Sequence, residues 1–340
     1  MFRQIIGVVA AAVAVAAAAV AQTPPSTPPQ GPVLAPAWDR SGDFAAPESA
    51  YYHAASNAVF VSSINGAILE KDGNGYISRL APDGTVVAAK WVTGLHAPKG
   101  LRSVGGMLWV SDIDEVVSID IATARVTARV KVDGAQFLND LATGPDGTVY
   151  VSDSALSKIY AVKDGRSSVF VEGADVVEQP NGLLVDGGRL ILGTIGPAAP
   201  VGRGAGQPAA TAPAAGRGQA PTGGAPAAGG AAAGGRGTPP ARPGGHLFAF
   251  DLRTKARTQL TTQPVGGIDG IEPDGRGGLL LTDVIGSRLL HVSAAGEVRV
   301  LGRFSAAGAD FGYIAASRMA LVPVLFGNNV AGFDLTAALR

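Results

Sequence analysis

Six short apolar segments recur along this chain at a nearly constant spacing, and this repeat limits the possible folds more than any other feature. Each segment is rich in Val, Leu and aromatic residues, as the buried strands of β-sheets are. Their last residues are Val61, Val110, Val151, Leu192, Leu281 and Pro323. Successive segments lie roughly 40 to 50 residues apart, except where a Gly-, Ala- and Pro-rich stretch, residues 196–245, adds to the spacing.

Short strands and tight turns fill the space between these segments. Asn-Gly and Asp-Gly dipeptides recur, for example at Asp83-Gly84 and Asp164-Gly165, and both types tolerate the positive φ of hairpin turns. A period of about 40 residues with four strands in each unit is typical of the blades of a β-propeller. We therefore predict an all-β, six-bladed β-propeller. A β-sandwich or an open β-solenoid of similar strand density is the alternative.

The two ends of the repeat predict how the ring closes. The last unit has room for only three strands before Arg340, and residues 33–44 can supply the fourth. Closure of the ring removes the exposed edges that an open sheet would leave. The propeller is expected to cover residues 37–340. Residues 196–245 fall within blade four, and we expect a disordered insertion because this composition cannot bury an apolar face. Whether it is a lid, a tether or a low-complexity expansion stays open.

The N-terminal residues predict export. Residues 1–21 combine Arg3, an apolar run and the small-x-small site Ala19-Val20-Ala21, as signal peptides do. An uncleaved anchor is the alternative, although the run is short for a membrane span. Residues 22–36 are rich in Pro and are expected to be an exposed linker. We expect a periplasmic or secreted protein without a stable membrane anchor.

The chain has no Cys, so its core must stabilise it without disulfides.

The balance of charged residues limits the classes of partner that we expect. Lys and Arg number 27, as do Asp and Glu, so the formal net charge is zero and no nucleic-acid partner is expected. The sequence contains no P-loop, no Gly-x-Ser-x-Gly and no His-Glu-x-x-His motif. A small-molecule substrate is the remaining expectation, and a protein partner is left open.

One polar residue stands just before the first strand of each unit. These residues are Glu48, Lys99, Asn139, Asn181, Asp269 and Asp310. In a propeller such positions converge on one mouth of the central channel. Carboxylates placed there repel one another, and a bound hard cation relieves that repulsion. We expect a divalent metal, first Ca²⁺, with Mg²⁺, Mn²⁺ or Zn²⁺ as alternatives. The lack of Cys and His in the set argues against a structural zinc site.

These positions resemble motifs of the SMP-30/gluconolactonase/LRE-like family of six-bladed propellers, which is related to paraoxonase-like lactonases. The matching segments are Glu48-Ser49-Ala50-Tyr51-Tyr52, Asn139-Asp140 before Pro145-Asp146-Gly147, Asn181-Gly182-Leu183 and Asp269-Gly270-Ile271. The resemblance implies that Glu48, Asn139, Asn181 and Asp269 are metal ligands. It also implies that Asp269 is catalytic, as a general base or by orienting the attacking water.

Other residues depart from the family pattern. Phe137 stands where sugar-lactone members carry an Arg that contacts substrate, which favours a more apolar ligand. Lys99 is not a usual ligand; it either acts in catalysis, by orienting an anionic substrate or protonating a leaving oxygen, or forms a charge-balancing ion pair. Asp310 is expected to shape the substrate pocket beside Lys99. His96, in a loop at the same mouth, is a candidate substrate contact or general acid/base, or else a surface residue.

Structural roles compete with some of these assignments. Asn139 and Asn181 belong to a residue type that also caps turns, and Asp140 is expected to support Asn139 rather than bind metal. An Asp preceded by Ser or Thr follows the second strand in three units. These residues are Asp112, Asp153 and Asp283, and their recurrence favours a structural role in a turn.

The sequence therefore predicts a metal-dependent hydrolase of lactones or related esters, with a metal-polarised carbonyl and a metal-bound water. A non-catalytic propeller that binds a ligand or protein around a structural metal is the alternative, since the fold alone does not imply catalysis. An isomerase or synthase on the same scaffold is a third possibility.

Overall fold

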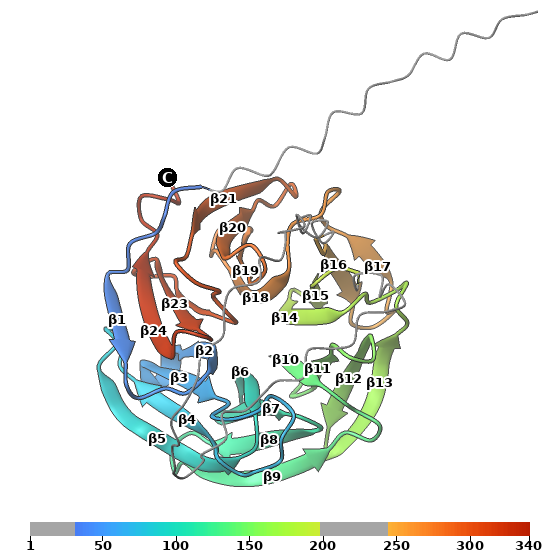
Figure 1. The fold of residues 1–340 in the computed structure, drawn as a ribbon. Helices are drawn as coiled ribbons and strands as arrows, with labels where there is room; N and C mark the ends of the chain where they lie inside the picture. Colours follow the sequence, from blue (N-terminus) through green and yellow to red (C-terminus); the bar gives the residue numbers. More distant parts are fainter. Residues whose placement is uncertain (1–30, 198–243) are drawn as a thin grey trace, which may run out of the picture.

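The computed structural model describes residues 31–197 and 244–340, which form six four-stranded antiparallel sheets around a central channel (Figure 1). The predicted six-bladed β-propeller is confirmed. The predicted signal peptide, most of the predicted linker and nearly all of the predicted insertion lie outside the described residues. The strands that flank this insertion are hydrogen-bonded neighbours in one sheet, blade four.

Each blade is a meander whose first strand lies at the channel and whose last strand lies at the rim (Figure 1). The strands of blades one to three are β2 (Pro47–His53), β3 (Ala58–Ser63), β4 (Gly75–Leu80), β5 (Val86–Leu95), β6 (Pro98–Val104), β7 (Met107–Asp112), β8 (Glu115–Asp120), β9 (Arg125–Lys131), β10 (Leu138–Thr143), β11 (Val149–Asp153), β12 (Lys158–Lys163) and β13 (Arg166–Glu172). The strands of blades four to six are β14 (Pro180–Asp186), β15 (Arg189–Thr194), β16 (Leu247–Asp251), β17 (Arg257–Gln259), β18 (Ile268–Pro273), β19 (Leu279–Asp283), β20 (Arg288–Val292), β21 (Val298–Arg303), β22 (Gly312–Ile314), β23 (Met319–Val324), β24 (Asn329–Asp334) and β1 (Trp38–Ser41). The helical structure in the described residues is one short 3₁₀ turn, η1 (Ala54–Ser56).

The N-terminal strand β1 closes the ring, as predicted. It pairs antiparallel with β24 and forms the outer strand of blade six. Trp38 is paired with Gly332, and its indole also lies against Gly84 of the neighbouring blade. A Cβ atom at Gly332 would overlap the indole, and one at Gly84 would lie 2.6 Å from it. The two glycines therefore make room for the side chain that anchors the closing strand.

The described end of the predicted linker is exposed but is not free of the propeller. The Leu34 amide donates to the carbonyl of Arg303 at 2.9 Å, and the Arg303 amide donates to the carbonyl of Pro32 at 2.8 Å. Arg303 ends β21, the outer strand of blade five, whose edge is otherwise open to pairing. These residues therefore cover part of that edge on the way to β1.

The core has one apolar cluster at each of the six blade-to-blade contacts and a small seventh cluster of Ile64, Ala97 and Ile113. Phe60 of blade one, for example, packs with Leu101 and Leu108 of blade two. The second strands β3 and β11 are buried on both faces, whereas the outer strands β9 and β17 are largely exposed. Burial of each such Leu or Phe side chain contributes about 1.5–3 kcal/mol. The fold is therefore held together by packing between blades.

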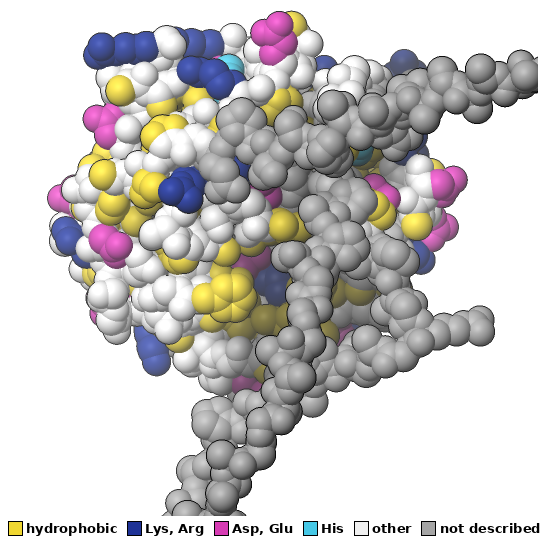
Figure 2. Space-filling view, turned by 45° about the horizontal axis from the view of Figure 1, so that its top comes forward, with side chains coloured by type: hydrophobic (Ala, Val, Ile, Leu, Met, Phe, Trp, Pro, Cys, Tyr) yellow, Lys and Arg dark blue, Asp and Glu magenta, His cyan; other side chains and the backbone are white. Residues whose placement is uncertain are grey.

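The face of the molecule seen in Figure 2 carries all classes of side chain. In the space-filling view, hydrophobic, acidic and basic side chains are interspersed, with a group of Lys and Arg side chains at the upper edge (Figure 2). This distribution agrees with the net charge of zero. Within residues 31–197 and 244–340 we find no helix of sufficient length and apolarity to cross a membrane.

Candidate functional site: a polar ring at one mouth of the channel

A register irregularity marks the predicted site residue in five of the six inner strands. The pairing of the first with the second strand shifts between Pro47 and Ser49, Pro98 and Leu101, Leu138 and Leu141, Pro180 and Leu183, and Ile268 and Ile271. These intervals contain Glu48, Lys99, Asn139, Asn181 and Asp269. A bulge redirects side chains at the point where it interrupts a ladder. We call these five residues and Asp310 the mouth ring.

The recurring Ser-Asp and Thr-Asp pairs hold these bulges in place. The Thr282 hydroxyl accepts a hydrogen bond from the Gly270 amide at 2.8 Å, and the Asp283 carboxylate accepts one from the Gly267 amide at 2.8 Å. The corresponding contacts in other blades are Ser152 with Asp140, Asp153 with Gln136, and Asp112 with His96 and Ala97. The structural role predicted for Asp112, Asp153 and Asp283 is therefore confirmed: they fix the loop that leads into each inner strand.

Glycine follows the mouth-ring residue where neighbouring inner strands approach closely. A Cβ atom at Gly182 would overlap the carbonyl oxygen of Asp269, and one at Gly270 would lie 2.7 Å from a carboxylate oxygen of Asp310. A Cβ atom at Gly100 would lie 2.5 Å from the Asp140 carboxylate. The glycines thus allow mouth-ring residues of successive blades to converge.

The two amides of the mouth ring donate hydrogen bonds to neighbouring side chains. The Asn181 amide nitrogen donates to the Asp269 carboxylate at 2.8 Å, and that of Asn139 donates to the Ser154 hydroxyl at 3.2 Å. Both side chains therefore bond to other side chains, and neither caps a turn through these contacts. The Asn181 amide oxygen is buried and has no hydrogen-bond partner in the described part of the chain.

The carboxylates of the ring are crowded and buried. Burial, followed by the negative charges of Asp269 and Asp310, raises the pKa of Glu48 well above its usual value, and Lys99 opposes the change. Burial and Asp310 raise the pKa of Asp269 to about 7, against the hydrogen bond from Asn181. One oxygen of Glu48 and one of Asp310 are buried without a hydrogen-bond partner among the described residues.

This donor set fits a hard divalent cation. Buried carboxylate and amide oxygens without partners are costly, and Ca²⁺ is bound by just such oxygens. Only Glu48 and Asp269 among the four implied ligands are carboxylates. The described residues contain no group of three or more His, Cys, Asp or Glu side chains arranged to hold a metal ion. Asn139 and Asn181 would supply the remaining donors to such a cation.

Lys99 is buried at the ring without an ion pair. Its side chain is 2% exposed, and its ammonium donates to the carbonyls of Ala97 at 3.0 Å and Ile68 at 3.2 Å. It also lies 4.9 Å from the centre of the Phe137 ring. Burial lowers the pKa of Lys99, while Glu48 and Asp112 oppose that shift. A charge-balancing ion pair, one of the two roles considered for Lys99, is not formed within the described residues.

A pocket of about 430 Å³ opens beside the ring between blades three and four. Phe137, Asn139 and Asn181 line it, together with Ser154, Ala155, Gln179 and Ile195. The structure thus brings Phe137 and two of the implied metal ligands to one concave surface. The last four residues were not predicted, because they lie in loops without a repeated pattern.

His96 and Asp310 make contacts that the sequence did not predict. The Nδ1 atom of His96 accepts a hydrogen bond from the Gly73 amide at 3.1 Å, which ties its ring to a neighbouring loop. Asp310 accepts a hydrogen bond from the Ser49 hydroxyl at 2.5 Å and faces Arg102. Neither residue lines the pocket that Phe137 lines. Glu48, Lys99 and Asp269 do not line this pocket either, so the substrate-binding assignment of His96 and Asp310 stays a prediction.

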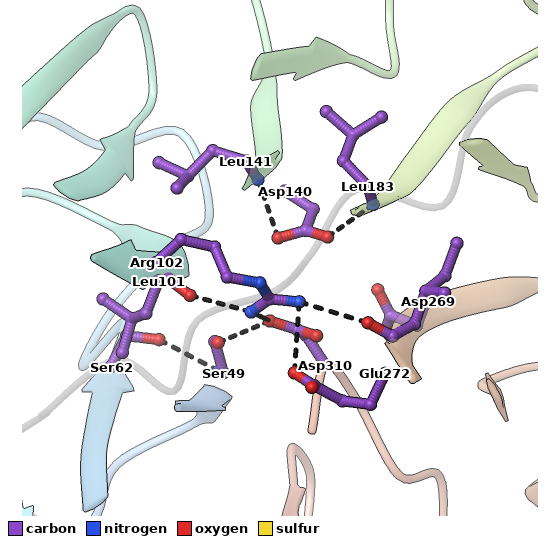
Figure 3. A network of polar contacts seen from close by, with 12 residues as sticks. Ser49, Ser62, Leu101, Arg102, Asp140, Leu141, Leu183, Asp269, Glu272 and Asp310 are labelled. Atoms are coloured by element: carbon purple, nitrogen blue, oxygen red, sulfur yellow. Dashed lines mark hydrogen bonds and ion pairs between the residues drawn. The ribbon is translucent and has the colours of Figure 1, made fainter. Parts of the chain in front are cut away.

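Next to the mouth ring lies a charged cluster, here called the channel cluster, which shares Asp310 with the ring and adds Arg102, Asp140 and Glu272. Arg102 and Glu272 were not predicted from the sequence. The buried Arg102 guanidinium lies 3.4 Å from Asp310 and 3.5 Å from Glu272, and Figure 3 shows the carboxylates surrounding it. Asp140 accepts hydrogen bonds from the amides of Leu141 and Leu183, both at 2.7 Å. Asp140 thus connects blades three and four, in addition to adjoining Asn139.

No family model matches the chain, and no curated protein matches it in sequence. Solved structures do match the fold. A gluconolactonase from Xanthomonas campestris aligns over 90% of this chain and 98% of its own, with 14% identity and a TM-score of 0.56. A nidogen/laminin complex aligns over 78% of this chain and 88% of its own, with 15% identity and a TM-score of 0.54. A catalytically inactive virginiamycin B lyase from Staphylococcus aureus with quinupristin aligns over 88% and 98%, with 10% identity and a TM-score of 0.51. At these identities the likeness establishes the propeller fold.

Proposed function

We propose that this chain is an exported, metal-dependent hydrolase of lactones or related esters, and that the reaction takes place in the pocket beside the mouth ring. The observation that carries the proposal is a set of buried oxygens on Glu48, Asn181 and Asp310 that have no hydrogen-bond partner among the described residues. They surround a crowded carboxylate pair. The sequence motifs that resemble the SMP-30/gluconolactonase/LRE-like family support it. So does the shared fold of a gluconolactonase.

Each mouth-ring residue has a role in this proposal. Glu48, Asn139, Asn181 and Asp269 would hold the cation, most readily Ca²⁺. The bound cation supplies Lewis-acid polarisation of an ester or lactone carbonyl. Asp269, oriented by its hydrogen bond from Asn181, would accept a proton from the attacking water.

Lys99 and Phe137 would act on the other side of the substrate. Two backbone carbonyls hold the Lys99 ammonium in one position, from which it would donate a proton to the leaving oxygen. Phe137 covers this ammonium and lines the pocket, so it would contact an apolar part of the substrate. An aliphatic or aryl lactone suits these walls better than a polyhydroxylated sugar lactone.

The test is turnover of a panel of aliphatic and aryl lactones and aryl esters by the purified protein, with and without a chelator. We expect activity that chelation removes, that added Ca²⁺ restores, and that Asp269→Asn lowers by at least about a hundredfold. Asp186→Asn is the matched control, because Asp186 is exposed at the far end of an inner strand, β14. Activity unchanged by both the chelator and Asp269→Asn would refute the mechanism.

A non-catalytic binding propeller is the second candidate. It is favoured by the fold shared with a nidogen/laminin complex, an assembly of two proteins. A folded, cation-loaded protein that hydrolyses no member of the panel would favour this candidate. The fold shared with a lyase makes product analysis necessary as well, since elimination or isomerisation leaves products different from those of hydrolysis.

A further inference from the structure

A second pocket lies between blades five and six, at the opposite end of the inner strands from the mouth ring. Its volume is about 490 Å³. Asp269 stands near the start of β18, whereas Asp274, which lines this pocket, follows the end of the same strand. The two sites therefore lie at opposite ends of β18, and the second pocket shares no lining residue with the first.

The lining of this pocket carries an excess of positive charge. Arg276, Arg299 and Arg318 contribute to it, and its one carboxylate is that of Asp274. This carboxylate is already engaged: it accepts hydrogen bonds from His291 Nε2 at 2.8 Å, from the Arg276 amide at 2.6 Å and from the Gly278 amide. A Cβ atom at Gly278 would lie 2.6 Å from the carboxylate, so glycine there allows the pairing with His291.

Several donors in the pocket have no acceptor. The guanidinium groups of Arg276 and Arg318 form no hydrogen bond or ion pair within residues 31–197 and 244–340, and Arg299 donates to the carbonyl of Ala338 at 2.8 Å. Tyr313 is 8% exposed and lines the pocket, yet its hydroxyl has no hydrogen-bond partner in the same described ranges. The hydroxyl is therefore free to donate a hydrogen bond to a ligand in the pocket.

From this arrangement we propose that the pocket binds a small organic anion through a phosphate or carboxylate group. Arg276 and Arg318 hold the oxyanion, since planar guanidinium groups match the geometry of such anions, and the Tyr313 hydroxyl donates a further hydrogen bond. The walls at Ala294 and Ala315 have small side chains, which leave room for the rest of the ligand. The site is distinct from the proposed hydrolytic pocket and does not depend on that activity.

The test is calorimetric titration of the full chain with inorganic phosphate and, separately, with succinate at low ionic strength. The native protein is expected to bind at least one probe saturably. The probe that binds with higher affinity shows whether the pocket prefers a phosphate or a carboxylate group. The double variant Arg276→Gln/Arg318→Asn is expected to weaken binding at least about tenfold. Asn is used at position 318 because φ there is 53°, a conformation that Asn tolerates.

Controls separate binding from folding. Tyr313→Phe is expected to weaken anion binding severalfold without changing the unfolding temperature. If the double variant does not fold, Tyr313→Phe alone tests whether the pocket binds the anion. Arg125→Gln, an exposed arginine on β9 of blade two, and Asp269→Asn are expected to bind as the native protein does. The absence of saturable binding of either probe to the native protein, or native affinity in both the double variant and Tyr313→Phe, would overturn the proposal.

Discussion

The guanidinium of Arg102 in blade two lies 3.4 Å from the carboxylate of Asp310 in blade six. It also donates to the carbonyl of Leu101 at 2.7 Å and lies 3.5 Å from Glu272 of blade five. Arg102 and Asp310 are 6% and 1% exposed. One buried cation thus joins three blades, and a carboxylate left without it would remain in a site of low polarity.

Replacement of Arg102 by Met is therefore expected to lower the free energy of unfolding by about 3–5 kcal/mol, because it leaves buried carboxylates uncompensated. Urea unfolding followed by circular dichroism measures the change. Arg125→Met, on the exposed outer strand of the same blade, is the control and is expected to change little. A loss below about 1 kcal/mol for Arg102→Met would show that the channel cluster contributes little to stability.

The raised pKa of Glu272 predicts that the stability of the fold depends on pH. Burial, with a smaller contribution from Asp310 that Arg102 opposes, raises its pKa from 4.5 to about 7. Between these values the folded state binds a proton that the unfolded state has lost, so the free energy of unfolding falls as pH rises through this window. The fall due to this group is roughly 3 kcal/mol at most. Glu272→Gln is expected to flatten the pH profile between 4.5 and 7, as measured by urea unfolding at several pH values. An unchanged profile would contradict this assignment.

Trp38 and Gly332 offer a test of ring closure. Gly332→Ala places a methyl group against the indole of Trp38 and is expected to cost about 1–3 kcal/mol. The same substitution should cost much less in a Trp38→Ala background, where the obstacle is absent. Chemical unfolding of the two single variants and the double variant measures this coupling. Additive costs would mean that Trp38 does not anchor the closing strand at this point.

Lys99→Met tests whether the buried lysine takes part in catalysis. If its ammonium protonates the leaving oxygen, kcat falls by roughly a hundredfold or more with little change in KM. The loss should be smaller for aryl esters with good leaving groups. Lys90→Met, at an exposed lysine of blade one, is the control. Native kcat with reduced stability would instead assign Lys99 to charge balance.

The repeat of hydrophobic segments was sufficient to predict the blades, because a propeller buries its second strands on both faces and marks each with an apolar run. Closure by the N-terminal strand followed from the missing strand before Arg340. Neither prediction required knowledge of side-chain contacts. The glycine after Lys99, Asn181 and Asp269 was visible in the sequence, but its reason, the close approach of the next blade, was not.

Arg102 and Glu272 could not be predicted in the same way. Each lies three residues after a mouth-ring residue, and in a regular strand that spacing places two side chains on opposite faces. The bulges at Lys99 and Asp269 shift this alternation, so both members of each pair are directed to the channel. The sequence likewise gives no sign of the arginine that faces Asp310. The predicted place of Asp310 at the substrate pocket stays a prediction.

The measurement that most directly tests the account is calorimetric titration of Ca²⁺ into chelator-treated protein. We predict binding of one cation for each chain, with affinity lowered by at least about tenfold in Glu48→Gln and in Asp269→Asn. Asp186→Asn should bind as the native protein does. Absence of binding to the native protein, or native affinity in both Glu48→Gln and Asp269→Asn, would contradict the proposal that the mouth ring is a metal site.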